Sequence, residues 1–150
     1  MPLPKEHIFL KGKVINARLY KGESPIDLSI EKWKIILKAL NWVSSRELPH
    51  KYIHNFLEDN VLGQNSCALC KTSKKKYIDT IGDIKYQDDK CKVCPLSKVD
   101  QCTRKESSYD LIEFSFYKCG EESNNEESML ELSSAIKKMI ANLENLKLSE

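Results

Sequence analysis

Two long stretches of the chain place apolar residues at the spacing of an amphipathic helix. The first covers residues 27–45, where either Asp27 or Ser29 can serve as the N-cap. One face of this helix carries Ile30, Trp33, Ile36, Leu37, Leu40 and Val43. A shorter helix is predicted over residues 49–62, with Gly63 as its stop signal. We expect these two helices to pack as an antiparallel pair.

The second long stretch, residues 128–150, begins with a capping box made by Ser128 and Glu131. Its apolar residues follow a heptad seam at Met129, Leu132, Ile136, Met139, Leu143 and Leu146. Ile140 widens this seam, which is typical of a helix that packs into its own domain. We therefore expect the helix to dock on its own chain and to cover one of the two tryptophans. The alternative is dimerisation through the same seam.

Three other stretches predict or allow strands. Residues 8–20 are rich in β-branched and aromatic residues, which predicts a strand pair or one bent strand. Residues 74–89, KKKYIDTIGDIKYQDD, predict a β-hairpin that turns at Gly82 and Asp83. Residues 107–118 fit either a helix or an extended core segment, because their apolar residues also alternate.

Length and composition predict a single domain of the α+β class. A chain of 150 residues with 41% hydrophobic and 31% charged residues suits one globular core. We divide it into a strand element at 1–26, a helical pair at 27–63, a four-cysteine metal module at 64–106, a core segment with a polar linker at 107–127, and an amphipathic helix at 128–150.

Four of the six cysteines form two Cys-x-x-Cys pairs separated by twenty residues, Cys67/Cys70 and Cys91/Cys94. Zinc prefers four thiolates at tetrahedral corners, and this spacing is close to that of a zinc ribbon. An intervening hairpin would bring the two pairs together. The sequence therefore predicts one structural Zn²⁺ on these four residues, with Cys102 as an alternative ligand.

Other uses of the cysteines have less support. Disulfides need an oxidising compartment, and neither pair is predicted to lie at a helix N-terminus, where a redox Cys-x-x-Cys usually sits. An iron–sulfur cluster held by Cys91, Cys94 and Cys102 is the main alternative to zinc. No secretion signal and no apolar run of membrane-spanning length is present, so we expect a protein of the reducing cytoplasm without a membrane partner.

Charge and motifs favour a binding protein over an enzyme. The chain has no glycine-rich phosphate loop and no recognisable nucleophile motif, so we predict neither catalysis nor a small-molecule substrate. Net charge is +3 over residues 1–63, +4 over 64–106 and −5 over 107–150. Four thiolates on one zinc would lower the middle value to about +2, which is too small to indicate nucleic-acid binding by charge alone.

Two surfaces are candidates for a macromolecular partner. Lys74, Lys75 and Lys76 with Tyr77 could follow a phosphate backbone and stack a base, although such lysines more often line a solvated edge. A protein partner would use an exposed tryptophan and the seam of the last helix. The residues of this second surface are Trp42, Leu132, Ile136, Met139 and Leu143.

The cysteine pattern also resembles a known set of proteins. Cys67-Ala-Leu-Cys70, then Cys91-Lys-Val-Cys94-Pro95-Leu96, then Cys102 and Tyr109 match small, largely uncharacterised cysteine-rich proteins of phages and prokaryotic mobile elements. The pairs are farther apart here than is usual in that set. The resemblance implies a small metal-stabilised domain.

We therefore predict a zinc-stabilised, non-catalytic binding protein that acts through protein–protein interaction, as an adaptor, an inhibitor or a complex subunit. A nucleic-acid-binding zinc ribbon is the first alternative. An iron–sulfur redox protein is the second.

Overall fold

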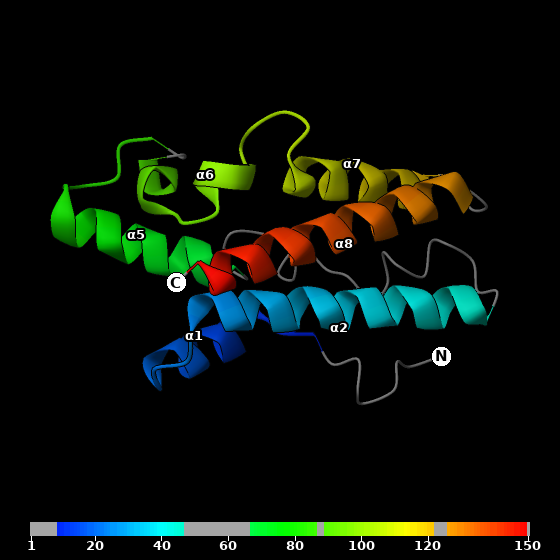
Figure 1. Ribbon diagram of the computed structural model, residues 1–150, viewed down its shortest axis with the longest axis horizontal. Helices are drawn as coiled ribbons and strands as arrows, with labels where there is room; N and C mark the ends of the chain where they lie inside the picture. Colours follow the sequence, from blue (N-terminus) through cyan, green and yellow to red (C-terminus); the bar gives the residue numbers. More distant parts are fainter. Residues whose placement is uncertain (1–8, 47–66, 87–88, 122–125, 150) are drawn as a thin grey trace.

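The computed structural model of the chain is helical throughout its described part, which covers residues 9–46, 67–86, 89–121 and 126–149 (Figure 1). Within these residues 77% are helical and none lies in a strand. The elements are α1 (Gly12–Tyr20), α2 (Pro25–Ser45), α5 (Ala68–Thr80), a 3-10 helix η3 (Asp89–Val93), α6 (Ser97–Asp100), α7 (Ser108–Glu121) and α8 (Glu126–Leu148). The predicted α+β class is therefore wrong.

The predicted N-terminal strand element is a helix, α1. Its residues do not alternate between core and solvent, because Lys13 and Val14 are both exposed, as are Asn16 and Ala17, while Ile15 between them is buried. Ile15 packs with Leu10 and two residues of later helices, and these contacts favour the helix over its local strand propensity. The following turn needs a left-handed residue, and Gly22 supplies it with φ +93°.

The predicted β-hairpin is also wrong, because its first half belongs to α5. Leu69, Ser73 and Tyr77 are buried at intervals of four residues, which is the stripe of a helix and not the alternation of a strand. Gly82 follows the helix with φ +150°. The Asp89 carboxylate then accepts hydrogen bonds from the backbone of residues 85 and 86, at 2.9 and 3.0 Å, and holds the next turn.

Helices α2, α7 and α8 form the main core. Figure 1 shows α8 lying along α2, and two ion pairs fix their antiparallel register: Lys147 to Asp27 at 2.8 Å and Lys34 to Glu144 at 3.0 Å. The buried residues of the three helices form one cluster that includes Ile36, Leu40, Val43, Ile112, Phe116, Leu132, Ile136, Met139 and Leu143. The last helix therefore docks on its own chain, as its wide stripe indicated.

The residues that begin the helices differ from the predicted ones, because a cap depends on one or two local hydrogen bonds that the pattern of apolar residues does not reveal. Helix α2 is capped by Ser24 and not by Asp27 or Ser29, the two predicted residues. The Ser24 Oγ accepts a hydrogen bond from the Asp27 amide at 3.3 Å, and Pro25 occupies the first turn. Helix α8 begins at Glu126, so Ser128 lies inside it and is buried. The ambiguous stretch after residue 107 is helical, as α7. The predicted helix over 49–62 lies outside the described residues.

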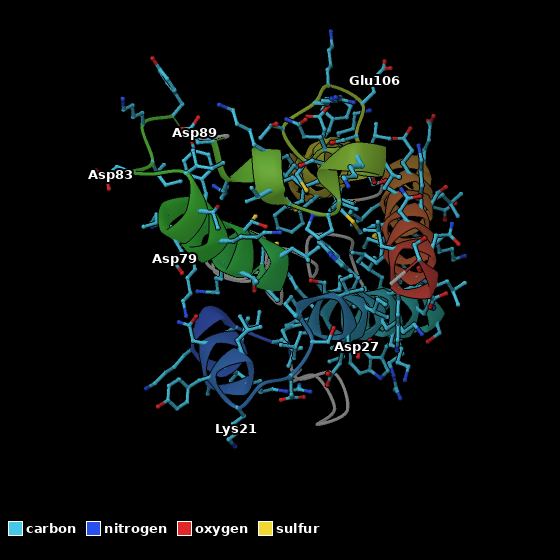
Figure 2. The ribbon with its side chains drawn as sticks, turned by 60° about the vertical axis from the view of Figure 1, so that its left-hand side comes forward. Lys21, Asp27, Asp79, Asp83, Asp89 and Glu106 are labelled. Atoms are coloured by element: carbon cyan, nitrogen blue, oxygen red, sulfur yellow. The ribbon has the colours of Figure 1, made fainter. Side chains whose placement is uncertain are left out.

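Charged residues surround this core. Figure 2 shows Lys21, Asp79, Asp83 and Glu106 at the periphery, pointing away from the helices, and all four are exposed. Glu106 adopts a left-handed backbone with φ 66° just before α7. Its amide donates to the Asp110 carboxylate at 2.9 Å, which ties the preceding loop to the first turn of α7.

Candidate metal centre

The first cysteine pair forms the first turn of α5. Cys67 is the N-cap residue, and its Sγ accepts a hydrogen bond from the Cys70 amide at 3.3 Å. A cysteine can cap a helix in this way because its sulfur takes the place of a serine oxygen. The prediction that neither pair lies at a helix N-terminus is therefore wrong for this pair.

The second pair lies where η3 ends. The Cys94 amide donates to the Cys91 carbonyl at 3.3 Å, and the Ser97 amide donates to the Cys94 carbonyl at 3.1 Å. These two bonds form consecutive turns that lead into α6. Because η3 packs against α5, the second pair lies beside the first without any hairpin between them.

Cys102 lies in the loop between α6 and α7, and side-chain hydrogen bonds attach this loop to the core. The Ser107 hydroxyl donates to the Cys102 carbonyl at 3.2 Å. The Asp100 carboxylate accepts from the Ser108 amide at the start of α7 and from Asn142 of α8, both at 2.8 Å. The position of Cys102 is thus linked to the position of α7.

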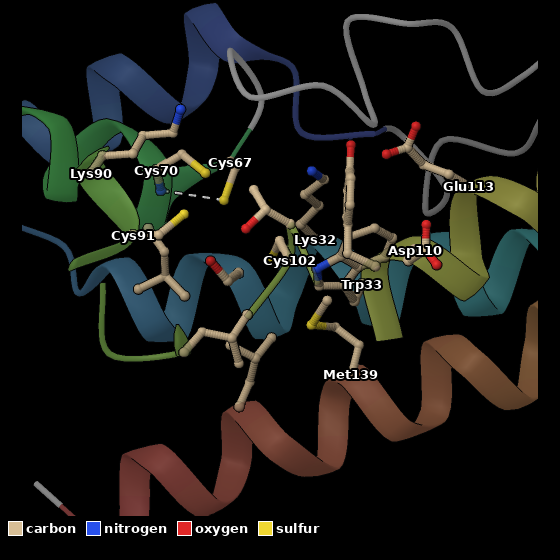
Figure 3. Close-up of a pocket in the computed structure, with 16 residues that line it drawn as sticks. Lys32, Trp33, Cys67, Cys70, Lys90, Cys91, Cys102, Asp110, Glu113 and Met139 are labelled. Atoms are coloured by element: carbon tan, nitrogen blue, oxygen red, sulfur yellow. Dashed lines mark hydrogen bonds between the residues drawn. The ribbon is translucent and has the colours of Figure 1, made fainter. Parts of the chain in front are cut away.

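These five residues (Cys67, Cys70, Cys91, Cys94 and Cys102, the cysteine cluster) lie at or near one cavity, which Cys94 does not line. The cavity has a volume of about 520 Å³, and four of the five cysteines line it together with residues of α2, α7 and α8. In Figure 3 the sulfurs of Cys67, Cys70 and Cys91 face the same space. Cys94 acts electrostatically on both Cys70 and Cys102. None of the five forms a disulfide.

The thiols of the cysteine cluster have unequal acidity. A hydrogen bond from the Cys70 thiol, together with the nearby charge of Lys32 and the Cys70 amide, lowers the pKa of Cys67 to about 6. The same thiol pairing and burial raise the pKa of Cys70, and burial raises that of Cys102. A metal ion binds thiolates, so it must displace protons from the two weaker acids.

Sequence reasoning missed two polar residues of α2 at this site. Lys32 is buried against the cysteine cluster with its Nζ 4.8 Å from the centre of the Trp33 ring, and Ser29 lies one turn earlier. Burial lowers the pKa of Lys32, while the charges of three thiols, including Cys67 and Cys102, raise it. The sequence feature that could have identified them is their position on or beside the apolar stripe of α2, which indicates that their side chains are buried.

The donor set of the cysteine cluster fits a thiophilic metal, but the ligand geometry is not assembled. In the described part of the chain, no group of three or more Cys, His, Asp or Glu side chains is arranged so that it could already hold a metal ion. Zinc would have to draw the sulfurs to about 2.3 Å from a common centre. The amide-to-sulfur bond at Cys67 and the buried ammonium of Lys32 both suit thiolate ligands.

The other predicted site residues separate into two groups. Lys74, Lys75 and Lys76 are exposed on α5, but the Tyr77 side chain is buried and so cannot stack a base. Of the predicted protein-binding surface, Trp42 is half-buried with Arg46 above its ring. The remaining residues of that surface are core residues: Leu132, Ile136, Met139 and Leu143.

Comparisons with known proteins give no relative. No family model matches the chain, and no curated protein or solved structure is significantly similar to it. The resemblance to cysteine-rich phage proteins stays a prediction. Among the described residues, no helix is long and apolar enough to cross a membrane.

Proposed function

We propose that the protein is a non-catalytic binding protein in which the cysteine cluster holds one Zn²⁺. The observation that carries the proposal is the meeting of Cys67, Cys70, Cys91 and Cys102 at one cavity, with Cys94 near enough to act electrostatically on Cys70 and Cys102. A shared ligand is a direct reason for segments this far apart in sequence to bring four thiols together. Zinc would join them and add directly to folding free energy.

Cys67, Cys70, Cys91 and Cys94 are the ligands that we propose, with Cys102 as the alternative fourth ligand. Zinc with four thiolates would carry a net charge of −2, and the buried Lys32, on whose charge three of the thiols act, would help to offset it. The iron–sulfur alternative uses the same thiols and differs in metal content and colour.

The surface that we propose for a protein partner is the exposed face of α7. Leu111, Phe114 and Tyr117 lie three residues apart and are 37, 57 and 54% exposed. Aromatic residues that stay exposed are enriched in binding surfaces, since burying them on a partner returns much free energy. The hydrogen bonds at Cys102 and Asp100 link the proposed metal centre to the N-terminus of this helix.

A photo-reactive amino acid at position 114 tests this surface. We expect cross-linking in native cells to give discrete adducts from position 114 that compete away when unmodified protein is added in excess. The control carries the same group in place of Ile78 of α5, which is also large, apolar and exposed. Adducts of equal yield and size from both positions, or none from position 114, would contradict the assignment of the α7 face.

The second candidate function is nucleic-acid binding, because Lys74, Lys75 and Lys76 are all exposed on α5. Consecutive residues of an α-helix point about 100° apart, so these three lysines cannot all contact one phosphate backbone. For this reason we consider a protein partner better supported.

Replacing the three lysines of α5 by glutamate separates the two functions. We expect wild-type protein and the triple variant to show equally little binding to single- and double-stranded DNA and RNA at about 0.15 M salt. Binding by the wild type that falls steeply with salt, with a slope reduced in the triple variant by about 0.9 for each lysine that contacts a phosphate of duplex DNA, would assign α5 as a nucleic-acid interface instead.

A further inference from the structure

Helix α2 presents two buried polar side chains to the cysteine cluster. Ser29 and Lys32 are only 4 and 3% exposed, lie one helical turn apart, and both line the cavity that the cysteines line. Most other buried residues of α2 are apolar, among them Ile26, Trp33 and Ile36. A hydroxyl and an ammonium at such positions need a reason, because burying polar groups costs free energy.

The two side chains have different surroundings, and both are hydrogen-bond donors that line the cavity of the cysteine cluster. In the described part of the chain, the Ser29 Oγ is buried without a hydrogen-bond partner. The Lys32 ammonium lies over the Trp33 ring, and Cys67, Cys70 and Cys102 are the thiols that act on its charge. Figure 3 shows Lys32 between Trp33 and the cysteine sulfurs.

We infer that Ser29 and Lys32 are positioning residues that donate to the sulfurs of an anionic metal–thiolate centre and offset its negative charge. The inference rests on the proposed function. Sulfur bound to a metal is an acceptor that outer donors stabilise, and such partners tune metal affinity without touching the ion. A buried ammonium is unfavourable beside neutral thiols and favourable beside thiolates, so Lys32 couples metal binding to the burial of its own charge.

This coupling predicts opposite effects on the metal-free and metal-bound protein. Lys32→Met keeps the length and apolar stem of the side chain and removes the charge. We expect the metal-free variant to be as stable as the wild type or more stable, because an unfavourable buried charge is gone. Zinc affinity is expected to fall about 10–100-fold, the usual effect of losing an outer-shell partner.

The experiment compares wild type, Lys32→Met, Ser29→Ala and the control Lys34→Met. Lys34 is a half-exposed lysine two residues along the same helix; its partner is Glu144 of α8, and neither residue lines the cavity of the cysteine cluster. Zinc dissociation constants come from competition with a chelator, and metal-free stability comes from urea unfolding. In the cobalt-substituted proteins we expect the sulfur-to-metal charge-transfer band to shift in Lys32→Met and in Ser29→Ala but not in Lys34→Met.

Each outcome has one meaning. Weaker zinc binding and a shifted cobalt band in Lys32→Met, with unchanged or higher metal-free stability, support the inference. Equal zinc affinity of Lys32→Met and Lys34→Met overturns it while leaving the proposed function intact. A Lys32→Met protein that is less stable without metal and has an unshifted band also overturns it, because the lysine would then act through packing. Failure of the wild type to bind zinc at all rejects the proposed function itself.

Discussion

Replacing Cys67 by serine is expected to abolish the stabilisation that zinc gives to the protein. Serine is close to cysteine in size and supplies a capping oxygen in place of the sulfur at the start of α5, but it is a poor zinc ligand. In the wild type, free zinc at about a thousand times its dissociation constant should raise the free energy of unfolding by about 4 kcal/mol. In Cys67→Ser this increment should disappear. The measurement is urea unfolding under reducing conditions, with zinc and with chelator.

The matched control is Cys119→Ala, which removes a thiol that is buried in the helical core and is not part of the cysteine cluster. It should lower the baseline stability and leave the zinc increment intact. Comparing Cys94→Ser with Cys102→Ser then identifies the fourth ligand, because only the true ligand should lose the increment. A zinc increment that survives in Cys67→Ser would contradict the ligand assignment.

Replacing Leu132 by alanine is expected to destabilise the protein by about 2–5 kcal/mol, because it leaves a cavity where α8 meets the core. For a chain of this length, that corresponds to a fall of roughly 4–20 °C in melting temperature. The chain offers a close control in Leu130, which lies two residues earlier on the same helix and is 71% exposed. Leu130→Ala should change stability by no more than about 0.5 kcal/mol. Urea unfolding monitored by circular dichroism measures both.

Sedimentation of the same two variants distinguishes core packing from dimerisation. If α8 packs on its own chain, the oligomeric state of Leu132→Ala should equal that of the wild type, and only stability should change. A wild-type dimer that becomes a stable monomer in Leu132→Ala would contradict the packing of α8 against α2 and α7.

Long amphipathic helices were predictable from the sequence because their patterns extend over many turns. Residues 27–45 and 128–150 correspond to α2 and α8 within three residues at each end. The widened stripe at Ile140 correctly indicated packing within the chain, and Ile140 is buried. The capping residues of these two helices were predicted wrongly, because which residue caps a helix depends on one or two local hydrogen bonds.

Strands were wrongly predicted where the pattern was short and the composition favoured them. In residues 8–20 the β-branched residues suggested a strand, yet Ile15 packs against Leu28 and Ala68, which are distant in sequence. In residues 74–89, Gly82 suggested the turn of a hairpin, but a glycine at this position is equally consistent with the end of a helix. Over windows this short, alternation and helical periodicity overlap, so tertiary contacts decide the outcome.

The cysteine cluster was predictable as a set, because the spacing of ligand-type residues is visible in the sequence. The surroundings of the cluster were not predictable from the sequence. The sequence placed a hairpin between the pairs, whereas η3 packing on α5 brings them together. Lys32 was overlooked because the apolar stripe of α2 was assigned to Trp33 and the other apolar residues, and the adjacent lysine was not considered as a buried residue. A lysine next to that stripe gives no sign that its ammonium is buried against thiols.

Metal content tests the central claim most directly. Protein purified without oxygen and without added chelator should contain about one zinc per chain by elemental analysis, and the chain should be colourless. Cys67→Ser purified in parallel should contain far less. Stoichiometric iron with a visible charge-transfer band, or no metal at all in the reduced wild-type protein, would contradict the zinc centre.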